Sequence, residues 1–341
     1  MLYCILDALK VNDVFTFLNR NKAVILWYHG VCDEQFKLLK GYDERHIPKT
    51  LFRDQLVYLK KKGYQFATMT ELMEKIRNNQ SVGKHVVLTF DDGFHNVVTN
   101  AYPVMKELNA KGCFFLVSGL IGTKELLWTD LIETVVGSCQ PGDFIFKFRG
   151  EDIIYHLDAR PTYHAAMTDI KFKLRTLPDQ ERKAHLKQFR DKVVGEIPKE
   201  FFLTNWDEIR KLDRNILEVG SHTKNHPNCA NLSSPQEFEE ELLRSQKDIE
   251  AKAGYSIKHF CYPAGSFSDE TVAYLKKYGY VSATTIIPGF VNGLTDSYKL
   301  KRVFVGEDPL LFKMMVSGCY FFLSQLKNGR KASDEYRVSY N

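Results

Sequence analysis

A run of apolar residues in this chain ends abruptly in two adjacent carboxylates and a glycine. Residues 86–90 have the composition of a buried strand, and Asp91, Asp92 and Gly93 follow directly. Two acids at the end of a buried strand are costly unless a metal ion, a proton or hydrogen bonds compensate their charge. The stretch therefore predicts a functional site at a strand end of an α/β protein, or alternatively a turn followed by a helix cap.

A pair of histidines follows another strand-like run, at residues 216–220. His222 and His226 are four residues apart, so both imidazoles can face one point in a helical turn or a tight loop. Such a pair alone is often two ordinary polar residues. Combined with one carboxylate from a second strand end, it forms a donor set for a divalent cation that leaves positions open for water or substrate. The other carboxylate is then free to act as a base.

Strand-like and helix-like patterns alternate along the chain, which predicts βα units and a parallel sheet. Patterns typical of strands cover residues 23–28, 86–90, 113–117, 216–220, 258–262, 281–286 and 299–305. Helical periodicity covers residues 51–62, 70–78, 97–110, 236–253 and 269–278. Closure of the sheet into a barrel is favoured, and the spacing is compatible with seven or eight strands.

Three motifs resemble the polysaccharide deacetylase family, also called carbohydrate esterase family four. They are Thr-Phe-Asp-Asp-Gly at 89–93, His-Thr-x-x-His at 222–226 and Phe-Cys-Tyr-Pro-Ala-Gly at 260–265. The resemblance extends over about residues 22–305. It implies an α/β fold, a distorted (β/α)7 barrel. It also implies a metal-dependent hydrolase, with one divalent metal, zinc by preference, that removes N-acetyl groups from amino sugars of a polysaccharide, oligosaccharide or glycan precursor.

The resemblance also implies roles for the residues of the first two motifs. Asp92, His222 and His226 would hold the metal, and Asp91 would take a proton from the attacking water.

The third motif would contribute a turn beside the substrate. The backbone N–H of Ala264, in the turn with Tyr262 and Pro263, would stabilise the oxyanion. The side chains of Tyr262 and Phe267 would line the acetyl pocket.

The chain also departs from the family pattern. Cys261 stands where the family usually has an arginine that orients the catalytic aspartate, and the usual fourth and fifth motifs are absent. Instead, a Trp-Tyr-His-Gly string near the start resembles permuted family members, in which an N-terminal histidine supplies the acid. His29 is therefore the candidate general acid, the alternative being a structural histidine bonded to a backbone carbonyl.

We expect three segments: an amphipathic N-terminal segment (1–21), the deacetylase barrel (22–326) and a polar tail (327–341). An insertion at about 122–202 separates two strands by more than a usual crossover. Its pattern predicts a helix, a hairpin and two further helices. The insertion would form a wall of the substrate cleft, a surface excursion or an oligomer contact. Trp128 and Asp130 could contact sugar, or the Trp128 ring could instead anchor the insertion to the barrel.

Composition limits the partners and the compartment. A net charge of +5 over 341 residues is too small to indicate nucleic acid binding. Seven widely spaced cysteines give no disulfide framework, and residues 1–10 lack the features of a signal peptide. We therefore expect a cytoplasmic enzyme with a carbohydrate substrate. The apolar run 309–323 predicts a core helix, or an interfacial anchor that contacts the inner membrane face.

Two other functions fit part of the pattern. The same metal site could hydrolyse another C–N amide or an O-acetyl ester, because function depends on the site rather than on the fold. Cys261 and the missing fourth motif would also suit a degenerate glycan-binding homologue. A pure binding protein has no need of a free carboxylate beside a metal, which favours the enzyme.

Overall fold

The computed structural model describes residues 10–33, 39–42, 45–193 and 196–328. The remainder of the expected N-terminal segment (1–9) and most of the expected polar tail (329–341) lie outside the described residues.

Seven parallel strands close into a barrel, in the order β1-β12-β11-β10-β9-β6-β5, with β5 pairing back to β1. They are β1 (Val24–Tyr28), β5 (His85–Phe90), β6 (Gly112–Leu116), β9 (Leu217–Ser221), β10 (His259–Cys261), β11 (Ser282–Pro288) and β12 (Leu300–Phe304). Each one overlaps a run that the sequence predicts as a strand, with ends that differ by at most two residues. The (β/α)7 barrel expected from the resemblance is therefore confirmed.

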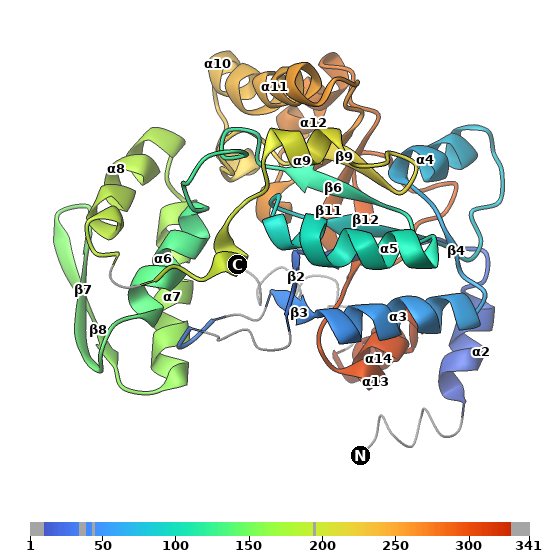
Figure 1. The fold of residues 1–341 in the computed structure, drawn as a ribbon, viewed down its shortest axis with the longest axis horizontal. Helices are drawn as coiled ribbons and strands as arrows, with labels where there is room; N and C mark the ends of the chain where they lie inside the picture. The colour runs from blue at the N-terminus through green and yellow to red at the C-terminus, as the bar shows by residue number, and fades with distance from the viewer. Residues whose placement is uncertain (1–9, 34–38, 43–44, 194–195, 329–341) are drawn as a thin grey trace.

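Helices surround the barrel, and Figure 1 shows them outside the strands. They are α2 (Val11–Leu18), α3 (Lys49–Lys61), α4 (Met69–Arg77), α5 (Tyr102–Leu108), α9 (Trp206–Arg210), α10 (Pro235–Phe238), α11 (Arg244–Ala253), α12 (Asp269–Lys277), α13 (Pro309–Ser317) and α14 (Cys319–Asn328). Two π-helical turns, η1 (Val97–Ala101) and η4 (Glu239–Leu243), run into α5 and α11. Short 3₁₀ turns are η2 (Lys199–Phe201), η3 (Cys229–Asn231) and η5 (Pro263–Gly265).

Three short strands were not expected from the sequence. β2 (Gly30–Cys32) and β3 (His46–Pro48) pair with each other, and β4 (Gln65–Phe66) pairs with the start of β5. Each has only two or three residues, too few for a periodic pattern to show.

Local capping chemistry sets the starts of several helices. The side chains of Thr68, Ser234 and Ser268 each accept a hydrogen bond from the backbone N–H three residues later, at α4, α10 and α12. At α10 the proline that follows Ser234 occupies the first helical position.

Strand alternation divides the apolar side chains of the barrel into two layers. The inner cluster includes Ile25, Val87, Cys113, Phe115, Cys261 and Leu300. The outer cluster, between strands and helices, includes Leu26, Leu88, Phe114, Val219, Phe260 and Tyr262. Neighbouring residues of one strand therefore face opposite layers, which decides which side chains can reach a site at the barrel's interior.

The expected insertion forms a unit with a core of its own. It consists of α6 (Trp128–Gly137), the antiparallel hairpin of β7 (Gly142–Phe148) and β8 (Glu151–Leu157), α7 (Arg160–Arg175) and α8 (Asp179–Arg190). Figure 1 shows it beside the barrel, with the hairpin on the far side. A separate hydrophobic cluster, from Trp128 to Phe189, holds it together. Asp130 is fully buried and paired with Arg45, so it presents no surface to a sugar.

The C-terminal apolar run forms two helices where the sequence predicts one. The axes of α13 and α14 meet at 85°, and Gly318 between them has φ +89°. A left-handed residue ends a helix, which explains the break. No single helix among the described residues is long and apolar enough to cross a membrane; α13 and α14 meet that criterion only as a bent pair.

The bend at Gly318 gives a stability prediction. A Cβ there would lie 2.6 Å from Asn19 Nδ2 and 2.8 Å from Phe290 Cε2, whereas a Cβ at Gly150, φ +91°, meets no atom within 4 Å. Left-handed backbone costs alanine roughly 1–2 kcal/mol at either site. Overpacking adds about 1–3 kcal/mol at Gly318. We expect Gly318→Ala to lower the urea-derived free energy of unfolding more than Gly150→Ala does; equal losses would contradict the packing.

Candidate active site

The residues singled out in the sequence meet at one end of the barrel. His29 follows β1, Asp91 and Asp92 follow β5, His222 follows β9 and the 261–265 turn begins at the end of β10. The carboxyl ends of parallel barrel strands share one face, so residues far apart in the sequence can form one site there. The end of the barrel where β5 and β9 finish is therefore the candidate active site.

Asp92, His222 and His226 form a compact donor group. Asp92 Oδ1 lies 3.4 Å from Nε2 of His222 and 3.4 Å from Nε2 of His226. One ligand atom from each residue lies within 4.8 Å of the other two. The sequence-predicted ligand set is therefore brought together in space.

Hydrogen bonding fixes the tautomer of His222. Its Nδ1 lies 2.7 Å from the carbonyl oxygen of Cys261. A carbonyl only accepts, so Nδ1 carries a proton, and Nε2 is the ring nitrogen that faces Asp92 Oδ1. Ligating histidines are oriented in this way in metal sites. A carboxylate with two nearby imidazole nitrogens is a suitable donor set for a divalent cation such as zinc.

Left-handed backbone is concentrated at this site. Asp92, Thr223, His226 and Ala264 have φ of 76°, 67°, 57° and 50°. Non-glycine residues seldom adopt such angles, and a β-branched residue such as Thr223 least of all. Strain of this kind persists only where surrounding contacts enforce it, and it clusters at functional sites.

Asp91 is held by an arginine that the sequence analysis missed. Arg302, on β12, donates from Nη1 to Asp91 Oδ1 and from Nη2 to Asp91 Oδ2, both at 2.8 Å. The same guanidinium donates to Thr89 Oγ1 and to the carbonyl of Thr285. Both side chains are almost completely buried. The bidentate contact uses both carboxylate oxygens of Asp91 and sets it apart from Asp92.

The ion pair keeps Asp91 charged. Burial alone would raise the pKa of the Asp91 carboxyl, but the Arg302 guanidinium, together with His222 and His29, outweighs it, and the pKa lies below its ordinary value. The pKa of Asp92 is also lowered, because His222 and His226 outweigh the effect of burial. Both carboxylates are therefore ionised at neutral pH.

Cys261 stands at the position where the family pattern usually has an arginine. Its side chain faces the barrel interior and groups with Asp91 and His222 as a second possible set of metal ligands. Arg302 already occupies both oxygens of Asp91, which disfavours this second set. Arg302 lies in the run 299–305, which the sequence predicts as a strand but which shows no fifth motif. Alternation along β12 places Leu300 inside the barrel, and therefore Arg302 as well.

His29 lies near both carboxylates. Its ring centroid is 5.2 Å from that of Trp27, and its charge helps to lower the pKa of Asp91 and of Asp92. It is partly exposed at the end of β1. The candidate acid is therefore in the same site as the candidate base and ligands.

The 262–265 turn contributes its backbone rather than the Tyr262 ring. The Tyr262 side chain is fully buried in the outer layer, stacks on Phe267 and donates its hydroxyl to the carbonyl of Tyr298. The expectation that the Tyr262 ring lines an acetyl pocket is therefore not met, whereas the same expectation for Phe267, which is partly exposed, stays a prediction. Alternation is the reason, because Cys261 takes the inward position. Pro263 is buried, and Ala264 lies in the turn with left-handed φ.

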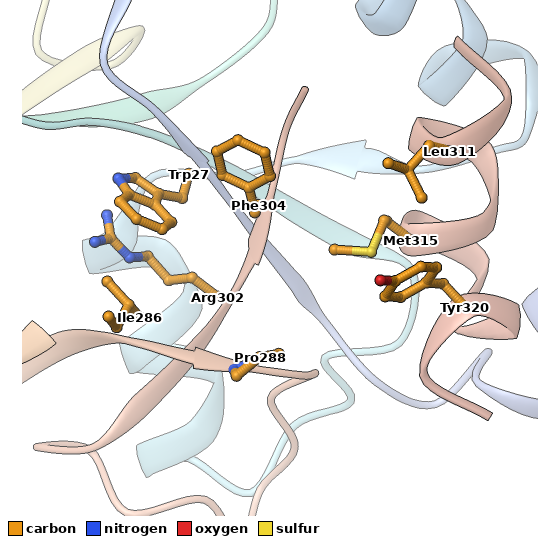
Figure 2. A pocket seen from close by; sticks show the side chains of 8 residues that line it. All are labelled: Trp27, Ile286, Pro288, Arg302, Phe304, Leu311, Met315 and Tyr320. Atoms are coloured by element: carbon orange, nitrogen blue, oxygen red, sulfur yellow. The ribbon is translucent and has the colours of Figure 1, made fainter. Parts of the chain in front are cut away.

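A pocket of about 140 Å³ borders Arg302 (Figure 2). Its lining consists of Trp27, Ile286, Pro288, Arg302, Phe304, Leu311, Met315 and Tyr320. The guanidinium carbon of Arg302 is 4.9 Å from the centroid of the Trp27 ring. Apolar and aromatic surroundings of this kind lower the local dielectric and strengthen the ion pair with Asp91.

A profile of the polysaccharide deacetylase family matches residues 78–143 and 174–283, just over half of the chain. The chain belongs to the polysaccharide deacetylase family. Between the two matched segments, the unmatched residues 144–173 lie inside the insertion. The family's aspartate and histidine motifs lie within the matched segments, whereas His29 and Arg302 lie outside them.

Two relatives whose names include a deacetylase are similar to parts of this chain. The polysaccharide deacetylase YxkH of Bacillus subtilis is 21% identical over 298 residues, which cover 86% of this chain and 76% of that protein. The poly-β-1,6-N-acetyl-D-glucosamine N-deacetylase of Staphylococcus aureus is 25% identical over 123 residues, 33% of this chain and 41% of that protein.

Two solved structures share the fold. IcaB from Ammonifex degensii aligns with a TM-score of 0.56 at 20% identity, and the alignment covers 87% of this chain and 96% of the IcaB chain. The Streptococcus pyogenes deacetylase PplD, solved with acetate, aligns with a TM-score of 0.55 at 18% identity and covers 84% and 93%.

The contact between Arg302 and Asp91 gives a pH prediction. Removing the cation in Arg302→Gln should raise the pKa of Asp91, so that this candidate base is protonated at a higher pH. The acid limb of kcat/KM should then move to higher pH, with a smaller move in Arg302→Lys, which keeps the charge without the planar fork. Thermal melting identifies the folded variants, because breaking a buried pair costs about 3–5 kcal/mol. An unmoved acid limb in both variants would show that Arg302 does not set this titration.

Proposed function

We propose that this protein is a zinc-dependent N-deacetylase that removes acetyl groups from the amino sugars of a glycan. One observation carries the proposal: an aspartate kept ionised by Arg302 stands directly beside a separate group of one carboxylate and two histidines. Family membership supports it, as do the activity in the name of the S. aureus relative and the acetate in the PplD structure.

Asp92, His222 and His226 are the residues that would hold the metal. A divalent cation bound there would polarise the amide carbonyl and make water a better nucleophile. With Nδ1 bonded to a carbonyl, His222 has Nε2 left to bind a cation beside the charge of Asp92, and the Arg302 contact leaves Asp91 outside this group.

The chain's own residues then account for the proton transfers. Asp91 takes a proton from the attacking water while the water oxygen bonds to the acetamide carbon. His29, as imidazolium, donates a proton to the sugar nitrogen when the C–N bond breaks. The products are acetate and the free amine. Ionised Asp91 favours the charged form of His29 close to it.

The turn after β10 would stabilise the negative oxygen of the tetrahedral intermediate. The backbone of Ala264 is held at φ 50° by hydrogen bonds from the N–H groups of Gly265 and Ser266 to the carbonyls of Tyr262 and Pro263. A rigid N–H donor in this place costs no reorganisation during the reaction.

Loss of the base tests the proposed function directly. We expect the native protein, supplied with Zn²⁺, to release acetate from oligomers of N-acetylglucosamine. Asp91→Asn should reduce this rate by about 10²- to 10⁴-fold, because the amide cannot accept the proton. Asp152→Asn, on the distant hairpin, controls for the chemical change. Near-native turnover by Asp91→Asn would exclude Asp91 as the base, and no acetate release by the native protein would contradict the proposal.

The role of His29 is tested by the leaving group. His29→Gln should slow hydrolysis of an acetamide far more than that of an acetyl ester with a good phenolate leaving group, which needs little protonation. The alkaline limb of the pH–rate profile should also disappear for the amide. Equal losses on both substrates, with the alkaline limb intact, would assign His29 a structural role.

A further inference from the structure

The loop that carries His226 is strained and depends on outside contacts. Thr223 and His226 both have left-handed φ, and the His226 N–H donates to Thr223 Oγ1 at 3.0 Å. Two non-glycine residues with left-handed backbone within four positions of each other cost of the order of a few kcal/mol. The conformation therefore requires partners for its other backbone groups.

Glu241, in the helix layer outside the barrel, holds the N–H groups of this loop. Glu241 Oε2 accepts from the backbone N–H of Lys224 and of Asn225, at 3.1 and 2.9 Å, and Glu241 Oε1 accepts from the Asn225 side chain at 2.7 Å. Glu241 lies in η4, which leads into α11 on the outside of the barrel. The barrel itself thus fixes one side of the loop.

The insertion holds the carbonyl side of the same loop. The indole Nε1 of Trp128 donates to the carbonyl of His226 at 3.0 Å, and Arg182 Nη1 donates to that carbonyl at 3.2 Å. Arg182 Nη2 also donates to the carbonyl of Asn225 at 3.2 Å. Three donors from the insertion thus converge on two consecutive carbonyls, one of which belongs to a candidate metal ligand.

Trp128 and Arg182 act together although they are 54 positions apart. Trp128 begins α6 and Arg182 lies in α8, and both helices contribute to the insertion's own core. The Arg182 guanidinium carbon lies 5.2 Å from the centroid of the Trp128 ring, and Asp179 pairs with the guanidinium. Arg182 is 1% exposed and Trp128 7% exposed. Long side chains buried and bonded in this way keep one geometry.

We propose that Trp128 and Arg182 are positioning residues, through which the insertion sets the orientation of His226 toward Asp92. The inference rests on the proposed function, because it takes His226 as a metal ligand. It also assigns a role to the part of the chain for which the sequence left three alternatives. A purely structural reading has the same contacts anchoring the insertion without affecting the metal site.

Metal affinity separates the two readings without relying on turnover. The full-length protein is freed of metal, and its affinity for Zn²⁺ is measured by competition with a chromophoric chelator. Trp128→Phe keeps the ring but loses the N–H, and Arg182→Met keeps the stem but loses the donors. Each should weaken Zn²⁺ binding about ten-fold, and the double variant up to about 100-fold, as is usual when partners that orient ligands are lost. The d–d spectrum of bound Co²⁺ should change as well.

Matched variants make the outcome specific. Trp206→Phe, on α9, and Arg190→Met, exposed on α8, should bind Zn²⁺ with native affinity.

His226→Ala is the reference for loss of a ligand. If it loses Zn²⁺ while Trp128→Phe and Arg182→Met keep native affinity and the native Co²⁺ spectrum, the inference is overturned and the metal site stands. If His226→Ala itself keeps native affinity, the metal site fails and the inference fails with it. Thermal melting checks folding, and Trp128→Phe suffices if Arg182→Met does not fold.

Discussion

The buried ion pair of Asp91 and Arg302 is the interaction on which the site depends. Two adjacent carboxylates at the end of a buried strand are tolerable only if their charges are compensated separately. Arg302 bonds both oxygens of Asp91, while Asp92 faces two imidazoles. This division assigns different chemistry to neighbouring residues: Asp91 is suited to accept a proton and Asp92 to bind a cation. The closed barrel makes the division possible, because β12 and β5 are separated only by β1.

The precision of the site comes from contacts made outside the barrel. Four non-glycine residues there have left-handed backbone, which their own sequence does not favour. Glu241 holds the histidine loop from the helix layer, and Trp128 and Arg182 hold it from the insertion. The contacts that hold the strained loop therefore come from two separately packed cores, and a close-packed core resists small displacements. Because the insertion packs its own core and also bonds the loop, the site extends beyond the barrel.

Sequence patterns predicted the strands of the barrel because buried parallel strands are short runs rich in apolar and β-branched residues, and the family resemblance implied that there are seven of them. Sequence reasoning also predicted the donor group, because His222 and His226 are four positions apart and the resemblance assigns Asp92, at another strand end, to the same group. It failed where a residue's position along a strand decides which side of the barrel it faces. Tyr262 faces outward, and the arginine that holds Asp91 is Arg302, on another strand. Only the strand register shows which residues face inward. It also read 309–323 as one helix, since the apolar pattern continues through Gly318 while the backbone does not. The contacts of Trp128 and Arg182 join residues too far apart in sequence for any local pattern to indicate.

The position of a bound cation tests the central claim most directly. Two ligand groups share His222: one includes Asp92 and His226, the other Asp91 and Cys261. A crystal structure of the protein with Zn²⁺, with anomalous diffraction at the zinc edge, distinguishes them. The account predicts one anomalous peak at about 2.0–2.2 Å from Asp92, His222 and His226, with Asp91 still bonded to Arg302. A peak coordinated by Asp91 and Cys261, with Arg302 displaced, would contradict the separation of base from ligand.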